Sequence, residues 1–497
     1  MEYFEKTVKA QTIKLHSLDM LAGFTNIPYI YYFENTSNDR DFMSADLLRD
    51  SFYHALLDFP ILAGNLCVGS DHTAHIVVDP NDLNMPEYIE SSSNIHFDFL
   101  KQASFAWSAL PKDVVTVGTI PTAGKHKRLK LANAHVTRLG DNSGVVLFFS
   151  TPHYAIDGVG YSMFINHWAS ICRSTKNNHA TAGAPNKGFL FDRSLINQCL
   201  PKDREPVDKP TLDVYMQESY LAKFLAWVSP ETRGSILTKA TKIEAIEGHV
   251  FRIPKLSLRR LHAAVEMWLP EKTRISDNDV LSGLLSMVVS QGVSSAKTYA
   301  ANPNSPMYEN IKNLASHMAS KLIKQSPDMW MTQIVLDIRS RIKSLRTLDY
   351  TGNAVISATV VAPLDLMQSK ITPKALAQAA MHVRHAVSQV TVGHIGQLMD
   401  LMPSEPDCYT RALANTSAFD EKLVISNQSK FPLYSVDFGF GTPSWISPIP
   451  AFYPNFASML PRPEAATDYY VYITSTKKAM QGILKNEFWL DCADLVY

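Results

Sequence analysis

The chain has 497 residues, of which 46% are hydrophobic, and its 47 basic residues balance its 47 acidic ones. This length exceeds one ordinary domain, so two or three domains are expected, and the balanced charge gives no support for a nucleic-acid partner. The five cysteines are few and none has zinc-ligand spacing, which favours reduced thiols and no metal site. Without a signal-like N-terminus or an apolar run of the ~20 residues that a membrane span needs, the sequence predicts a cytoplasmic protein.

The first half of the chain alternates strand and helix patterns. The aromatic and apolar run 29–33 predicts a strand, and Ser44 can cap a helix that ends before Pro60. Another strand is expected near 73–78. The apolar run 145–149 then predicts a buried strand because its residues are β-branched, aromatic or aliphatic without a polar break.

A histidine follows that buried strand directly. His153 stands where the strand ends, Asp157 lies four residues on, and Gly158 opens a segment with helical apolar spacing. Imidazole titrates near neutrality, so His153 suits the removal of a proton from a hydroxyl or amine. The alternative is a histidine satisfied by a backbone carbonyl, with Asp157 capping the helix. The pattern His-x-x-x-Asp-Gly alone does not decide between them.

The composition changes after the first half and the same ingredients then recur. Residues 177–210 are rich in Asn, Pro, Lys, Gly and Asp, which with the mixed segment after them favours a crossover between two domains. Alternating strands and helices in both halves predict two α/β layers. The later elements expected are a helix beginning at Ser276, a polar insertion over 296–327, strands over 333–338 and 354–361, a helix beginning at Thr372, a strand over 469–473 and a short helix over 477–484.

A second notable stretch, Asp437-Phe-Gly-Phe-Gly, lies near the end of the chain. Its two glycines allow positive φ angles, and Asp437 can cap the turn or pair with an arginine. No Lys-Ser/Thr pair and no Rossmann spacing follow it, so a phosphate-binding role is poorly supported.

The two motifs together resemble those of the BAHD acyltransferases, which are acyl-CoA-dependent O- and N-acyltransferases of specialised metabolism. Asn65 stands where the family usually has arginine, and Phe440 where plant members have tryptophan. Further matches in family order are 59–66, 191–195, 275–282, 335–341 and 350–355.

The resemblance implies two similar α/β domains, like those of chloramphenicol acetyltransferase, with mixed sheets, flanking helices and a solvent channel between them. We therefore expect an N-terminal domain over 1–210, a crossover segment over 211–245 and a C-terminal domain over 246–497. In this family part of the second half crosses back to the first domain, and the helix near 372–402 is the candidate for it.

The resemblance also implies the reaction. His153 would act as general base while an acyl group passes from acyl-CoA to a hydroxyl or amine of a small metabolite, in a ternary complex without an acyl-enzyme. Acyl-CoA would be a co-substrate, no cofactor would be bound permanently, and the protein would be a monomer. An inactive member that binds CoA or a metabolite is the alternative.

Asp157 has two interpretations. It could orient the imidazole and count as catalytic with His153, as in a Ser-His-Asp triad. In the family this aspartate instead turns away and pairs with an arginine, for which Arg339 is the first choice and Arg341 the second.

The remaining site residues also come from the resemblance. For the oxyanion and the substrate channel they are Ser426 and Gln428, where Gln428 replaces the family's tryptophan. Gly158, Arg339, Asp437, Gly439 and Gly441 would support the structure. Lys255, Arg259 and Arg260 could meet the phosphates of CoA, although a solvated helix face explains them equally well.

Two related classes fit less well. Condensation domains of peptide synthetases carry a second histidine directly before the motif, where this chain has Pro152. Carnitine-type acyltransferases are usually longer and lack the Asp-Phe-Gly-x-Gly loop.

Overall fold

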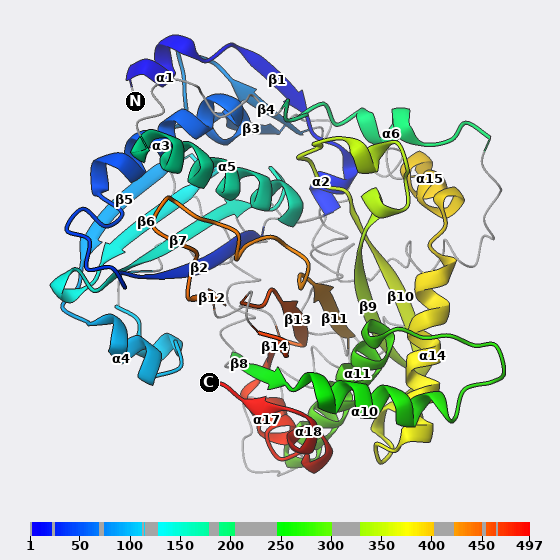
Figure 1. Cartoon of the computed structure of the whole chain (residues 1–497). Helices are drawn as coiled ribbons and strands as arrows, with labels where there is room; N and C mark the ends of the chain where they lie inside the picture. The colour runs from blue at the N-terminus through cyan, green and yellow to red at the C-terminus, as the bar shows by residue number, and fades with distance from the viewer. Residues whose placement is uncertain are drawn as a thin grey trace.

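The structure of this chain is a computed structural model. It describes residues 2–21, 25–68, 74–111, 114, 128–177, 188–203, 246–300, 329–401, 422–449, 454–463 and 466–497. Its strands form sheets of five, seven and three strands, and helices lie against them (Figure 1). The α/β class with mixed sheets, expected from the sequence, is confirmed.

The five-stranded sheet belongs mainly to the first half of the chain. Its order is β12 (Trp445–Pro448), β2 (Asn26–Glu34), β7 (Gly144–Pro152), β6 (Asn133–Arg138) and β5 (Glu87–Ser92). Only the β5–β6 pair is parallel. Every residue of β7 is buried, which explains why the stretch 145–149 is a continuous apolar run rather than an alternating one.

Two helices cover one face of this sheet. They are α3 (Ala45–Asp58) and α5 (Gly158–Lys176), which pack side by side (Figure 1). Trp168 of α5 is fully buried there and donates from its indole nitrogen to the Leu48 carbonyl, 3.1 Å away. Around this layer lie α1 (Glu2–Thr7), α2 (Ser17–Leu21), α4 (Phe97–Gln102), α6 (Leu195–Cys199) and a small sheet of β1 (Gln11–Lys14), β4 (Ala74–Val78) and β3 (Asn65–Val68).

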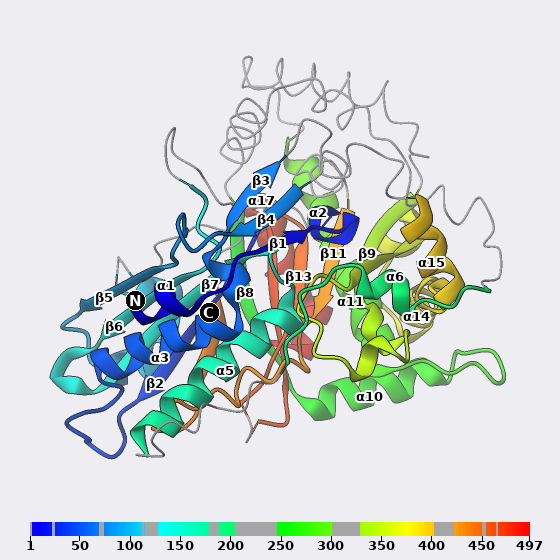
Figure 2. The same ribbon diagram turned by 90° about the horizontal axis from the view of Figure 1, so that it is seen from above.

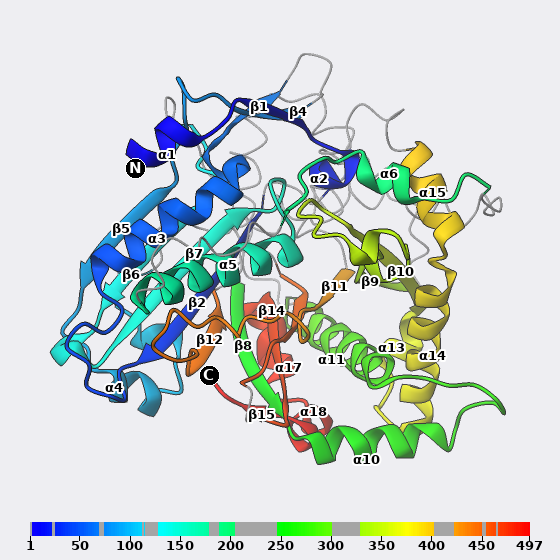
Figure 3. The ribbon, with the colours of Figure 1, turned by 45° about the horizontal axis from the view of Figure 1, so that its top comes forward.

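The seven-stranded sheet forms the second half. Its order is β10 (Val355–Pro363), β9 (Met329–Asp337), β11 (Lys422–Asn427), β13 (Phe456–Leu460), β14 (Tyr469–Thr476), β8 (Ile246–Ile253) and β15 (Asp494–Leu495). The helices of this half are α10 (Lys255–Glu266), α11 (Asp277–Ala300), α13 (Leu364–Gln368), α14 (Pro373–Gln389), α15 (Val392–Leu401), α17 (Lys477–Ile483) and α18 (Glu487–Cys492) (Figure 3).

The two faces of the seven-stranded sheet differ. Alternate residues such as Ile334 and Ile425 are buried in one core cluster with α11 and α14. The intervening residues of β9, β10 and β11 are mostly half-buried, and one row across the sheet pairs Ser357 with Val335, Val335 with Ser426, and Ser426 with Ser458. One face of the sheet is therefore fully buried, and the other face is partly exposed.

The segment that crosses between the halves is β12, which pairs with β2 in the first sheet (Figure 1). The expectation that the helix from Thr372 packs with the N-terminal half is wrong. Thr372 does cap α14, its hydroxyl accepting from Ala375 N at 3.2 Å, but the buried face of α14 packs against α11 and β10. The periodicity of the sequence shows that one face of this helix is apolar. It does not show which sheet that face packs against.

Other expected boundaries need adjustment. The helix α11 continues to Ala300, so the polar insertion does not begin at 296. Residues 301–327 of that insertion and the whole crossover segment 211–245 lie outside the described residues. Within the described part of the chain, no helix combines the length and apolar character of a membrane span.

An aromatic cluster joins the two large sheets. Tyr32 and Phe148 come from the five-stranded sheet, Tyr472 comes from the seven-stranded one, and Trp445 of β12 lies among them. The Trp445 ring stacks on Phe105 at 5.8 Å between centroids and meets Tyr470 edge-on at 5.1 Å. Figure 2 shows the two halves lying side by side, which this cluster helps to hold in place.

Replacing Trp445 by alanine is expected to lower the free energy of unfolding by about 3–5 kcal/mol, because the lost ring leaves a cavity between the sheets. Urea denaturation followed by circular dichroism measures it. The matched control is Trp268→Ala, whose side chain is 53% exposed and whose loss should change stability by less than about 1 kcal/mol. Equal effects would contradict a structural role for the crossing strand.

Candidate active site

His153 lies immediately after β7, where the chain turns toward α5. Its backbone N–H donates to the Thr25 carbonyl at 2.7 Å, which ties the turn to the segment that leads into β2. The turn closes when Ala155 N donates to Pro152 O at 3.0 Å, and α5 begins at Gly158. The His153 side chain is half-buried, while Tyr154, Ala155 and Ile156 are buried. The imidazole therefore sits at the end of a rigid strand.

The imidazole of His153 bonds to Asn353, a residue just before β10. His153 Nδ1 lies 2.8 Å from Asn353 Oδ1, and Asn353 Nδ2 donates to the His153 carbonyl at 2.7 Å. Asn353 Nδ2 also donates to Asp19 Oδ1 at 2.8 Å. Because the amide nitrogen faces two acceptor oxygens, the amide oxygen must face the imidazole.

This arrangement decides the tautomer of His153. An amide oxygen only accepts hydrogen bonds, so Nδ1 of the imidazole carries the proton and donates it. In the neutral imidazole the other nitrogen, Nε2, then has a free lone pair. An unprotonated Nε2 is what a general base requires.

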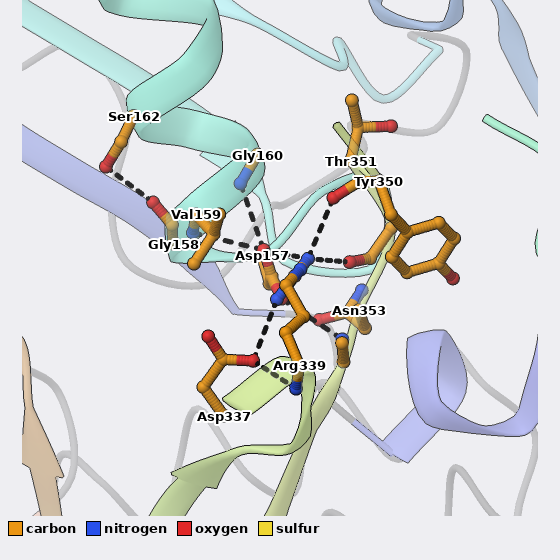
Figure 4. Close-up of polar contacts among 12 residues, drawn as sticks. Asp157, Gly158, Val159, Gly160, Ser162, Asp337, Arg339, Tyr350, Thr351 and Asn353 are labelled. Atoms are coloured by element: carbon orange, nitrogen blue, oxygen red, sulfur yellow. Dashed lines mark hydrogen bonds and ion pairs between the residues drawn. The ribbon is translucent and has the colours of Figure 1, made fainter. Parts of the chain in front are cut away.

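Asp157 does not touch the imidazole and instead forms a buried ion pair with Arg339 (Figure 4). Arg339 Nη1 lies 2.8 Å from Asp157 Oδ2, and Nη2 lies 3.2 Å from Oδ1. The carboxylate also accepts from Val159 N and Gly160 N, so it caps α5. Asp157 is therefore a positioning residue, and its interpretation as a direct partner of His153 is corrected.

The Asp157–Arg339 pair holds the segment that carries Asn353. Arg339 Nη2 donates to the carbonyls of Tyr350 at 3.0 Å and Gly352 at 2.7 Å, and Ala354 N donates to Asp157 Oδ2 at 3.1 Å (Figure 4). Burial acts to lower the pKa of Arg339, but the Asp157 charge and its hydrogen bonds more than offset this and raise the pKa above its usual value. The arginine thus remains charged.

The first choice of partner for Asp157, Arg339, is the residue found there. The second choice, Arg341, donates instead to the carbonyls of Val390 at 2.7 Å and Val387 at 3.2 Å, at the end of α14. Both arginines follow β9 closely, which is why the sequence alone could not separate them.

Gln428 follows β11 and connects the two halves. Its Oε1 accepts from the Tyr29 hydroxyl of β2 at 2.6 Å and from the Ser458 hydroxyl at 2.8 Å. Burial raises the pKa of Tyr29 well above its usual value, so this hydroxyl stays protonated and donates. With both donors on its oxygen, Gln428 has its amide nitrogen left to donate elsewhere. Ser426, two residues earlier, lies on β11 beside Ser458.

The chain after Gln428 runs along α5. Asn166 Nδ2 donates to the Pro432 carbonyl at 3.0 Å, and a Cβ at Gly158 would lie only 2.4 Å from the Phe431 ring. A side chain at position 158 would therefore require the Phe431 ring to move.

The loop that begins at Asp437 is built around its carboxylate. Asp437 Oδ1 accepts from the backbone of Gly439 at 2.7 Å, Phe440 at 3.2 Å and Gly441 at 3.0 Å. Gly439 and Gly441 have φ angles of 95° and 98°, which only glycine adopts easily. Arg173 of α5 donates to the Asp437 carbonyl at 2.9 Å. These contacts give the loop an architectural role.

The cationic residues suggested for CoA lie elsewhere. Lys255, Arg259 and Arg260 belong to α10, which packs on α11 and α14 at the outer edge of the second half (Figures 1 and 3). Arg259 and Arg260 are exposed. No contact places them beside His153, so their role stays a prediction.

Sequence reasoning missed three residues of the site. Asn353 lies within the matched segment 350–355 and Arg193 within 191–195, and Asp19 lies in none of the matched segments. Arg193 Nε lies 3.2 Å from Asp19 Oδ2, and the exposed fractions of the two side chains are 2% and 0%. The sequence feature that could have identified Asn353 as a site residue is its position directly before a predicted strand. Asp19 has no such signal because it meets Asn353 only through the fold.

Comparison with known proteins agrees with these features. The model of the Transferase family matches residues 5–252 and 311–489. The chain therefore belongs to this family, the BAHD acyltransferases that its motifs resemble. A hydroxycinnamoyltransferase of Narcissus pseudonarcissus is 21% identical over 453 residues, covering 90% of this chain and 88% of its own length. Shikimate O-hydroxycinnamoyltransferase of Nicotiana tabacum is 21% identical over 447 residues, with coverage of 90% and 88%.

Among solved structures, F. sporotrichioides TRI101 complexed with coenzyme A and T-2 superimposes with a TM-score of 0.70. It is 15% identical, and the match covers 98% of this chain and 100% of that one. At this identity the likeness establishes the fold.

Replacing Arg339 by methionine should lower the free energy of unfolding by about 3–5 kcal/mol, because Asp157 would remain buried without its countercharge. Arg49→Met is the matched control, since Arg49 pairs with Asp46 on the surface and its loss should cost less than about 1 kcal/mol. Chemical denaturation of both variants makes the comparison. Equal losses would mean that the buried pair is not a structural support.

Proposed function

We propose that this protein transfers an acyl group from acyl-CoA to a hydroxyl or amine of a small-molecule acceptor, with His153 as general base. The observation that carries the proposal is the hydrogen bond between His153 Nδ1 and Asn353 Oδ1, which leaves Nε2 free to accept a proton. Membership of an acyltransferase family supports the reaction class. The coenzyme A bound in the structural relative supports the co-substrate.

The reaction needs no protein nucleophile. The acceptor oxygen or nitrogen attacks the thioester carbonyl while His153 Nε2 takes its proton. The tetrahedral intermediate then collapses, the carbon–sulfur bond breaks, and the imidazolium returns the proton to the leaving thiolate. The products are the ester or amide and free CoA, and His153 is restored. No permanently bound cofactor enters these steps.

The developing oxyanion needs a hydrogen-bond donor, and we assign this donor role to the amide nitrogen of Gln428. Tyr29 and Ser458 occupy the oxygen of this amide and so fix its orientation. In this proposal the side-chain amide of Gln428 is the donor at the position where plant relatives have a tryptophan.

The half-buried face of the seven-stranded sheet continues from Gln428, and we assign the substrate channel to it. Ser426 lies two residues before Gln428 on β11, so the two side chains share a face, and Ser357 lies in the row of Ser426. This proposal assumes the predicted division into domains over 1–210 and 246–497 joined through 211–245. It also keeps the prediction that the protein acts as a monomer in the cytoplasm.

His153→Ala should lower kcat by about 10²-fold or more, because the general base is lost, while binding of CoA is retained. Release of free thiol from a panel of acyl-CoAs with mixed alcohol and amine acceptors measures turnover, and calorimetry measures CoA binding. His75→Ala, on the peripheral strand β4, is the matched control and should keep wild-type turnover. Turnover that is equal in all three proteins would remove His153 from the mechanism. CoA binding without turnover in the wild type would favour the inactive binding protein.

Gln428→Glu keeps the length of the side chain but replaces its donor by a carboxylate oxygen. It should lower kcat by roughly 10²-fold, because a negative oxygen would face the oxyanion. Gln198→Glu on α6 is the control, since its amide bonds only to Ser194 among the described residues. An unchanged kcat in the Gln428 variant would show that the oxyanion donor lies elsewhere.

A further inference from the structure

Asp19 lies at the centre of a buried network that ends at the imidazole. It is fully buried on the short helix α2, far in sequence from both Asn353 and Arg193. Its Oδ1 accepts from Asn353 Nδ2 at 2.8 Å and from Asn353 N at 3.1 Å. Its Oδ2 accepts from His16 N at 2.8 Å and lies 3.2 Å from Arg193 Nε.

Three of these groups donate hydrogen bonds to the carboxylate, and Arg193 adds an ion pair. A carboxylate is the side chain that accepts at both ends, whereas an amide of the same size presents a donor at one end. Arg193 supplies the countercharge that makes a buried carboxylate tolerable, and its Nη2 donates to the Ala155 carbonyl at 2.6 Å. The network therefore also reaches the backbone two residues after His153.

Asp19 determines which way the Asn353 amide points. If that amide were turned over, its oxygen would face two acceptors, the Asp19 carboxylate and the His153 carbonyl, and neither contact could be a hydrogen bond. A buried mismatch of this kind costs more than an ordinary hydrogen bond is worth. The observed orientation, with the oxygen on His153 Nδ1, is thus imposed by Asp19 together with the His153 carbonyl.

We propose that Asp19 is a positioning residue which acts through Asn353 to hold His153 in the Nδ1-protonated tautomer. The relay runs from Arg193 to Asp19, then to Asn353, and then to the imidazole. It gives His153 a neutral amide as its direct partner and keeps the carboxylate one residue further away. The expected effect on catalysis rests on the proposed function. The tautomer of His153 does not, because it is a property of the protein without substrate.

The structural test is histidine-selective ¹⁵N labelling of the full chain at a pH of about 8, where an ordinary imidazole is neutral. The chain has 16 histidines, and the His153→Gln variant assigns the signal of His153. In the wild type we expect a protonated Nδ1 and an unprotonated Nε2. In Asp19→Asn we expect a mixture of tautomers. A pure Nδ1-protonated signal in this variant would overturn the proposal.

The kinetic test uses Asp19→Asn, Asn353→Ala and the double variant. Each single change should lower kcat by about 10-fold or more with little change in KM, because the fraction of His153 ready to accept a proton falls. The double variant should be no slower than Asn353→Ala, since residues of one relay are not additive. Additive losses, or wild-type kcat in Asp19→Asn, would overturn the relay.

Two further variants keep these tests decisive. Asp58→Asn removes a carboxylate that meets the buried His167 at 2.7 Å in the same half of the chain, and it should alter neither the His153 tautomer nor kcat. If Asp19→Asn does not fold because Arg193 is left unpaired, Asp19→Asn combined with Arg193→Gln removes both charges and is measured instead. A wild-type tautomer there would overturn the proposal. Failure of acyl transfer with the expected tautomers would count against the proposed function alone.

Discussion

The geometry of the site depends on the buried negative charge of Asp157. Asp157 is fully buried, and its carboxylate is stabilised by a bidentate contact with Arg339 and by backbone N–H groups from both halves of the chain. Loss of Arg339 would leave this buried charge uncompensated, which disfavours any arrangement that separates the pair. The start of α5 and the segment 350–354 are therefore held together at a fixed distance, and His153 and Asn353 meet where they are joined.

Two buried carboxylates thus divide one task. Asp157, with Arg339, fixes the backbone around Asn353, whereas Asp19, with Arg193, fixes its side chain. Neither carboxylate contacts the imidazole. Placing both charges at a distance leaves His153 beside a neutral amide, so that the network sets its orientation and tautomer without adding an anion next to the ring.

The sequence predicted local features well and long-range contacts poorly. The strand before His153, the cap at Thr372 and the Asp157–Arg339 pair were all expected, because apolar runs, capping residues and motif spacing are local or carried by the family resemblance. A return of the second half to the first domain was expected, but not that β12 makes it, and the role of Asp19 was not expected at all. Each depends on pairing between segments more than 300 residues apart, which no periodicity encodes.

The neighbours of Gln428 explain why a glutamine suits the position at which the family resemblance implies tryptophan. A tryptophan can offer only its indole N–H, and its ring needs apolar neighbours. Here the neighbours are the hydroxyls of Tyr29 and Ser458, which an amide oxygen satisfies while its nitrogen remains a donor. A return to tryptophan at this position would leave both hydroxyls without that acceptor. Gln428, Tyr29 and Ser458 are therefore joined by hydrogen bonds as one unit in this chain.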